Sequence, residues 1–249
     1  MKTITSLSFL FLFSFNTYSQ NITNTLGAGG VFTIKDNTNT FFSLNQTDST
    51  INIPGNIILS DVPGSIEGVI YKGSQEFLHN YSPSGSNGFN TFLGIYAGNF
   101  RMSGSGDESS YNTGIGHLAL TELSTGQNNT AVGDNSLGSN SSGNFNTAVG
   151  SLSLNNNTTG NDNTAVGHGA LFTNDDGINN VAIGHGSLGA NVSGDFNTAV
   201  GHSSLNANTG NNNTAVGFYS LNLNTAENNT AEHDNSICQF RESLTGVVN

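Results

Sequence analysis

The sequence contains no tryptophan and a single cysteine, Cys238, among 249 residues. One cysteine cannot form a disulfide within the chain, so packing and hydrogen bonds must stabilise the fold. The residues around Cys238 also break the repeat described below, and no base accompanies this thiol in a recognisable motif. Neither a redox nor a catalytic role is indicated for it.

Charge is scarce, and positive charge is scarcest. Charged residues make up 9% of the chain, against about 25% in ordinary soluble domains. Five basic residues stand against 17 acidic ones, which gives a formal net charge of −12. The last lysine is Lys72, and only Arg101 and Arg241 follow it. A phosphate backbone needs a basic stripe, so nucleic acid is excluded as an expected partner.

The N-terminus carries the one long apolar run, Leu7 to Phe15, which follows Lys2 and precedes the small residues Thr17 and Ser19. This order is typical of a secretory signal peptide, and cleavage is expected near Ser19. The run is too short to cross a hydrocarbon core of ~30 Å. We therefore expect a protein that is secreted or held at the outer cell surface, with no transmembrane segment after cleavage.

Between residues 112 and 231 one phrase returns at nearly constant spacing, in forms such as YNTGIG, NNTAVG, FNTAVG and NNVAIG. We number the residue after the repeated Asn as position zero. Copies then begin at Thr113 and recur every 17 residues, with two final steps of 16 that end at Thr230. A fixed period indicates a repeat architecture, and the abundance of Gly, Asn and Thr disfavours helix. An outlying copy, FNTFLG, spans 89–94.

Four positions of the unit are almost invariant: Asn at −1, Val or Ile at +2, Gly at +3 and Leu at +7. In the five central units these are Asn129, Asn146, Asn163, Asn180 and Asn197; Val132, Val149, Val166, Ile183 and Val200; Gly133, Gly150, Gly167, Gly184 and Gly201; and Leu137, Leu154, Leu171, Leu188 and Leu205. The pattern predicts a strand of about five residues, a Gly turn, a second short strand carrying the Leu, and a return turn. Units stacked about 4.8 Å apart place identical residues over one another, and stacked Asn side chains can form a hydrogen-bonded ladder.

Alternation along a strand puts positions zero and +2 on one face and position +1 on the other. We expect Thr and Val to face inward, and the small residues at +1 to form an outer strip: Ala131, Ala148, Ala165, Ala182 and Ala199. Two or three buried side chains per unit, at about 1.5–3 kcal/mol each, are few against an ordering cost of about 1–2 kcal/mol per residue. Self-association through the Ala strip, about a three-fold axis, is therefore expected.

The chain is expected to divide into four parts. These are a signal peptide (1–19), an N-terminal region of short β-strands (20–88), the repeat head (89–231) and a degenerate or truncated tail (232–249). The N-terminal strands are predicted from five β-branched and aromatic runs, Val31–Ile34, Thr40–Leu44, Thr50–Ile53, Asn56–Leu59 and Gly68–Tyr71. The tail begins where Glu232 and His233 replace the Val and Gly of the repeat.

The one cluster with possible metal chemistry is the column His168, His185 and His202 at position +4 of consecutive units. Stacked about 4.8 Å apart, two imidazoles could share a zinc ion. No carboxylate recurs beside them, however, and a tolerant, solvent-facing turn position explains them better. No nucleophile elbow or phosphate loop is present in the sequence. We expect no enzyme, no cofactor and no metal site.

The phrase NVAIGHGSLG at 180–189 resembles the repeat of trimeric autotransporter adhesin heads. NTAVG, together with FTIKDNTNTFFSL and GVIYKGSQEFLHNY upstream, resembles secreted bacterial tail-fibre-domain proteins. The resemblance implies an all-β fold, a left-handed parallel β-roll within the class of parallel β-solenoids, three copies packed as a homotrimer, and a fibrous head exposed at a surface.

The sequence therefore predicts a fibre or adhesin head that mediates adhesion or acts as a spacer, with an unidentified surface receptor or glycan as its partner. One alternative is a solenoid that binds ice or a crystal surface through the Thr column. Against it, that Thr is expected to face inward with Val and Ile, and Val181 interrupts the column. A second alternative is a polysaccharide-binding protein like a phage fibre.

Overall fold

The structure is a computed structural model that describes residues 31–35, 40–45, 50–52, 69–72 and 74–235. The chain forms two compact units, 1–57 and 58–249. The first contains an antiparallel meander of β1 (Val31–Lys35), β2 (Thr40–Asn45) and β3 (Thr50–Asn52). These strands coincide with three of the predicted N-terminal runs. The predicted strand at 56–59 lies outside the described residues.

The second unit is built on one 11-stranded sheet. Its first strands, β4 (Ile70–Lys72) and β5 (Gln75–His79), form an antiparallel hairpin, and β5 pairs antiparallel with β6 (Thr91–Leu93). From β6 onward every pairing is parallel. The remaining strands are β7 (Thr113–Ile115), β8 (Thr130–Val132), β9 (Thr147–Val149), β10 (Thr164–Val166), β11 (Val181–Ile183), β12 (Thr198–Val200), β13 (Thr214–Val216) and β14 (Thr230–Ala231). The sheet thus begins before residue 89, where the repeat head was expected to start.

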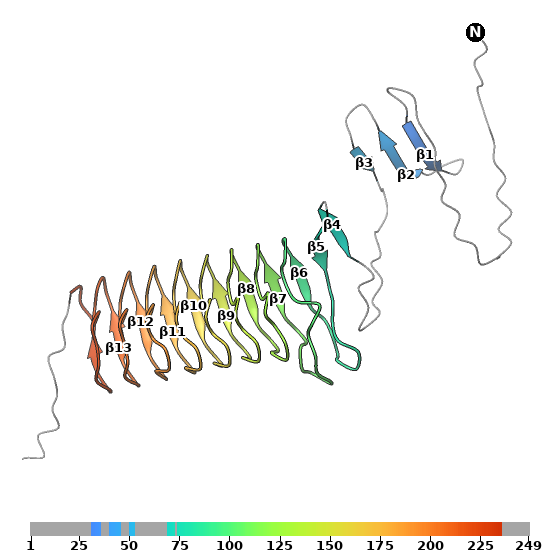
Figure 1. Ribbon diagram of the computed structural model, residues 1–249. Coiled ribbons are helices and arrows are strands. Elements are labelled where there is room, and N and C mark those ends of the chain that lie inside the picture. Colours follow the sequence, from blue (N-terminus) through green and yellow to red (C-terminus); the bar gives the residue numbers. More distant parts are fainter. Residues whose placement is uncertain (1–30, 36–39, 46–49, 53–68, 73, 236–249) are drawn as a thin grey trace, which may run out of the picture. The chain divides into compact units, whose positions relative to one another are not determined.

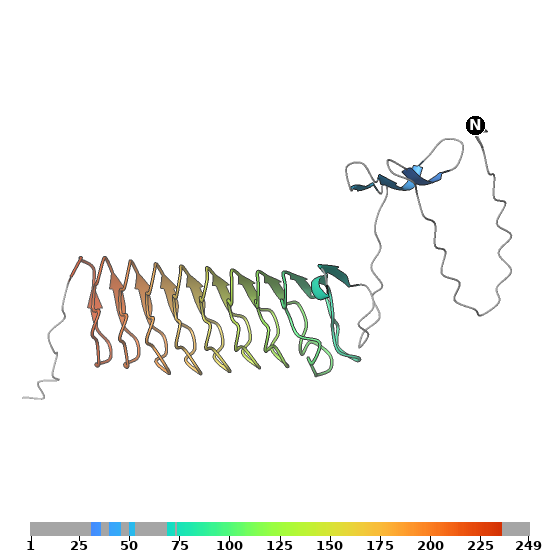
Figure 2. The same cartoon turned by 45° about the horizontal axis from the view of Figure 1, so that its top comes forward.

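Successive strands pair position for position, as when Val149 pairs with Val166 and Val166 with Ile183. Figures 1 and 2 show the result as a straight stack of similar rungs, each with its arrow on the same side. The described residues contain no helix. The predicted fold class, an all-β parallel solenoid with about 17 residues per turn, is confirmed.

The predicted second strand carrying the Leu was wrong. Each strand from β6 to β13 has only three residues, and the conserved Leu lies in a turn with φ between 47° and 56°. The Leu side chain is nevertheless fully buried at Leu137 and Leu154. Its backbone N–H still reaches the next rung, because Leu137 N donates to Ser153 O at 3.0 Å. Rung-to-rung hydrogen bonds therefore continue through the turns without strand geometry.

The predicted orientation of the strands was also wrong. The Ala at position +1 is fully buried in every unit from Ala131 to Ala215, whereas Val166 at position +2 is 37% exposed. Little space surrounds position +1. At Gly114, the +1 residue of β7, an added Cβ would lie 2.9 Å from Phe92 Cδ1 in the preceding rung and 3.3 Å from Ala119 O in its own rung. In β6 the buried Phe92 takes position +1, and its ring fills the space beside Gly114. From β8 to β13 the +1 residue is always Ala, and the bulkier Thr, Val and Ile face outward.

Asparagine fills much of the remaining interior and is fully hydrogen-bonded there. Asn163 Oδ1 accepts from both the backbone N–H of Asn180 (3.0 Å) and Asn180 Nδ2 (3.1 Å), and Asn163 Nδ2 donates to Gly177 O at 2.7 Å. The bond from the backbone N–H recurs on either side, where Asn163 N donates to Asn146 Oδ1 and Asn197 N donates to Asn180 Oδ1. A second buried column runs parallel to it, in which Asn157 Nδ2 donates to Asn140 Oδ1 at 2.8 Å. The core of the roll is thus as much an amide network as an apolar one.

Candidate binding face

The outward side of the parallel strands is a regular surface that runs along the roll. We call positions zero and +2 of β6 to β13 the exposed sheet face. From Thr91 to Val216 these positions hold only Thr, Val, Ile and Leu. The position-zero side chains from Thr113 to Thr214 are half-buried, whereas Val149, Val166 and Ile183 at +2 are exposed. The face is therefore flat, repetitive, largely apolar and free of charge.

One border of this face is formed by position −2. All nine of its residues have φ between 56° and 62°. Five are Asn or Asp, which tolerate this left-handed region, but four are aromatic, which do so poorly. The aromatic ones are Phe89, Tyr111, Phe145 and Phe196. Phe89 and Tyr111 stack with ring centroids 5.5 Å apart, whereas Phe145 and Phe196 have Asn or Asp neighbours in the column and are 53% and 54% exposed.

The other border is formed by position +4, which includes the predicted histidine column. The structure brings His168, His185 and His202 together as stacked rings, with centroids 5.1 and 4.9 Å apart and interplanar angles of 9° and 12°. Phe218 continues the stack at 5.3 Å. In parallel rings the nitrogen lone pairs lie in parallel planes and do not converge on one point. Within the described ranges no group of three or more His, Cys, Asp or Glu side chains is placed to hold a metal ion.

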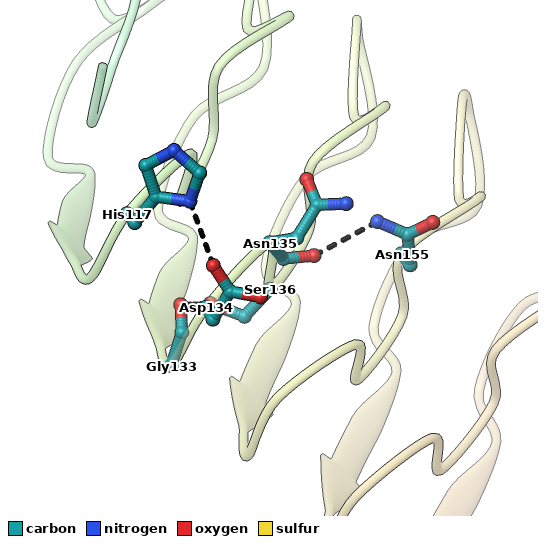
Figure 3. Close-up of polar contacts among 6 residues, drawn as sticks. All are labelled: His117, Gly133, Asp134, Asn135, Ser136 and Asn155. Carbon is teal, nitrogen blue, oxygen red and sulfur yellow. Dashed lines mark hydrogen bonds and ion pairs between the residues drawn. The ribbon is translucent and has the colours of Figure 1, made fainter. Parts of the chain in front are cut away.

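Further up the same border, His117 and Asp134 contact each other across adjacent rungs, with Nδ1 and Oδ1 2.8 Å apart (Figure 3). Both side chains are about half exposed, so this pair contributes little to stability. The nearby Ser136 does not complete a catalytic arrangement. Its hydroxyl is buried and donates to Gly133 O at 3.1 Å, away from the imidazole. These residues serve rung-to-rung contact.

The antiparallel end of the roll holds a small aromatic cluster around His79. The imidazole is buried, packs against Phe92 and Phe100, and lies with Nε2 2.7 Å from Ala97 O. Tyr81 N–H donates to Nδ1 at 3.3 Å, so Nε2 carries the proton of a neutral ring. A cavity of about 210 Å³ opens beside it, lined in part by polar groups of Glu76, Tyr96 and Arg101. It contains none of the residues singled out in the sequence.

Burial lowers the pKa of His79 below its ordinary value of 6.5, against smaller opposing effects of Ala97 O and Glu76. The unfolded chain therefore takes up this proton first as the pH falls. The contribution of the neutral, buried His79 to the free energy of unfolding is fully present above pH 6.5, and it is lost as the pH falls through the folded-state pKa. We expect the melting temperature to fall from pH 7.5 to pH 5, and to fall less in His79→Gln, which cannot titrate. Equal pH dependence in both proteins would contradict this assignment.

Two features of the candidate face were missed in the sequence. The outward direction of Thr and Val was one, and the aromatic residues at −2 were the other, because they resemble ordinary variation at a turn. The signal for the first was present in the invariance of Asn at −1. That position shares a face with +1, and a polar residue that never varies is typical of a buried, fully bonded site.

Across the described part of the chain, no helix has the length and apolarity needed to cross a membrane. Comparison of the chain with family models, with curated proteins and with solved structures found no match.

Proposed function

We propose that this chain is a non-enzymatic fibre or adhesin head, secreted or held at the cell surface, that assembles into a homotrimer through its exposed sheet face. The observation that carries the proposal is the uncharged column of outward Val and Ile on a flat parallel sheet. Contiguous exposed apolar surface of this kind is typical of interaction sites. The N-terminal apolar run supports export, and the resemblance of the repeat to trimeric heads supports three copies.

A second copy of the same chain is the partner that the charges favour. The chain carries a net charge of −12, which opposes association of copies wherever charged surfaces meet. Positions zero and +2 hold no charge from β6 to β13, so two copies can meet there without repulsion between like charges. Identical rung spacing in both copies also lets Val of one copy pack between rungs of the next.

The exposed sheet face and its two borders together offer nearly the area of one standard interface. Eight strands at about 4.8 Å spacing span roughly 34 Å, and the seven residues from −2 to +4 span roughly 20 Å. Their product, roughly 700 Å², is close to the approximately 800 Å² that each partner buries in a standard interface. In a trimer each copy divides this area between two neighbours, so each pairwise contact buries about half of it.

Val166→Asp tests the assembly. The side chain already contacts water in the isolated chain, so the free energy of unfolding of the single roll should change by less than about 1 kcal/mol. In the assembly the carboxylates of neighbouring copies would meet in an apolar interface, and association should be lost. Sedimentation measures the oligomeric state and thermal melting measures the fold.

Val192→Asp is the matched control, because Val192 is equally apolar, exposed and placed in a turn outside the face. It should leave association unchanged. A trimer of Val166→Asp that persists at low micromolar concentration would exclude the exposed sheet face as the interface. A glycan and matrix-protein binding screen on the assembled protein then tests the adhesive role separately.

The outward Thr column favours a second candidate, a face that binds ice or another crystal. The argument that Thr points inward no longer holds, since Thr147 and Thr164 lie on the outer side of the sheet. The column repeats at about 4.8 Å along the roll, although Val181 interrupts it. Ice growth inhibited by the parent and not by Thr147→Lys would support this candidate, and no inhibition would exclude it.

A further inference from the structure

The exposed sheet face has a register problem, because its rungs are nearly identical. A copy that slips by one rung still places Thr beside Thr and Val beside Val, and it loses only the contacts of the end rungs. A regular face therefore discriminates poorly between alignments of two chains. Discrimination must come from side chains that do not repeat in every rung.

The aromatic residues at position −2 are such side chains. Phe89 and Tyr111 stack on each other within the roll, but the isolated roll gives no reason for the presence of Phe145 and Phe196. Each holds a left-handed backbone, with φ of 56° at Phe145 and 57° at Phe196. Other rungs use Asn or Asp at this position, such as Asn128 and Asp162, which adopt the same conformation with less strain. More than half of each Phe side chain is exposed, so burial within the chain does not offset the strain. Some gain outside the single roll must offset it.

We propose that Phe89, Tyr111, Phe145 and Phe196 are covered by a second copy of the chain and fix the axial register of the assembly. This inference rests on the proposed function. The rings border the uncharged face, and they stand in rungs β6, β7, β9 and β12, with intervals of one, two and three rungs. Such uneven spacing gives one alignment in which all four rings stand level with their counterparts. A slip of one or two rungs aligns a single pair and a slip of three rungs aligns two, and the other rings then stand level with Asn, Asp or solvent.

A reversal of sign tests whether the rings are covered. In the Val166→Asp background, which keeps the chains apart, Phe145→Asn should raise the melting temperature by about 2 °C, because Asn relieves the strained backbone. In the assembled parent the same substitution should lower it, because a covered ring is lost. The paired control is Leu223→Asn, which removes an exposed apolar side chain in a turn outside the face and should shift both backgrounds alike. An increase in both backgrounds with Phe145→Asn would overturn the proposal.

Disulfide mapping tests the register directly. The full chain with Cys238→Ser is prepared in two forms, Val149→Cys and Val166→Cys, which are mixed, assembled and oxidised. These two residues stand on adjacent rungs, so aligned copies form 149–149 and 166–166 bridges, whereas a slip of one rung forms 149–166 bridges. Aligned bridges should exceed mixed ones by about tenfold in the parent.

Phe145→Asn and Phe196→Asn are then added to both cysteine forms, and the fraction of mixed 149–166 bridges should rise at least about threefold. The control pair, Val192→Asn with Leu223→Asn, should leave this fraction unchanged. An unchanged ratio in an assembly that still forms would overturn the register proposal and leave the proposed function intact. A parent chain that does not assemble at all would instead contradict the proposed function.

Discussion

Replacing Gly167 by alanine is expected to destabilise the roll by about 3–5 kcal/mol, among the largest effects of any single methyl group in this chain. Two causes act together. The backbone of Gly167 has φ +135°, a conformation that L-residues rarely adopt, and an added Cβ would lie 2.6 Å from the carbonyl oxygen of Gly184 in the next rung. Neither the φ angle nor the close contact can relax, because the backbone on both rungs is held by rung-to-rung hydrogen bonds.

Gly169, two residues further on, provides the matched control. Its φ is +63°, an added Cβ would meet nothing within 4 Å, and other rungs place Leu118 or Asn135 there in the same conformation. Gly169→Ala should therefore cost only about 1 kcal/mol. Urea unfolding of the two variants gives the comparison. Similar losses in both would mean that the column at +3 is not set by close approach of backbones.

Asn163→Ala should have the second large effect, again about 3–5 kcal/mol. The substitution removes three hydrogen bonds from the ladder and leaves the buried N–H of Asn180 without a partner. Gly177 O keeps the bond from Asn174 Nδ2, and Asn180 Nδ2 keeps its bond to Gly194 O. A buried polar group without a partner costs about 1–3 kcal/mol. The loss should appear in the free energy of unfolding and in faster amide exchange of Asn180.

Asn156→Ala is the control for the ladder, because Asn156 is exposed on the turn side of the same rung. It should change the free energy of unfolding by less than about 0.5 kcal/mol. Equal melting temperatures of the two alanine variants would mean that the Asn ladder forms because the rungs stack and does not itself stabilise the stack.

The stacking of rungs could be predicted from the sequence because a fixed period places like residues over like. The facing of the strand could not, since alternation shows that Thr164 and Val166 share a side but does not show which side is inner. Hydrophobicity favoured Val166 as the core residue. The space inside the rung determines which side is inner. Buried side chains such as Leu171 and Asn174 fill the interior from the far side of the rung. The backbone there follows turns that could not be predicted from the sequence.

The conserved Leu illustrates the same limit. A Leu at constant spacing predicted a strand, because a left-handed backbone is unfavourable for that residue. In the roll, burial of Leu137 and the bond from its N–H to Ser153 O offset this cost. The Ala strip, expected on the outer side of the strands, is buried, and Val and Ile take the outer side instead. The aromatic border of the exposed sheet face became visible only when the φ angles and exposures were known together.

Pairing of identical positions in every rung also bears on how the gene can change. If residues 146–162 were deleted, β8 would meet β10, and Asn129 would bond Asn163 through the same atoms that now bond Asn146. Loss or gain of whole units in the gene can thus shorten or lengthen the roll without creating an unfavourable junction. If the uneven aromatic border aligns the chains, the aromatic positions of alleles with different numbers of rungs would no longer coincide. Each allele would then assemble only with copies of the same length.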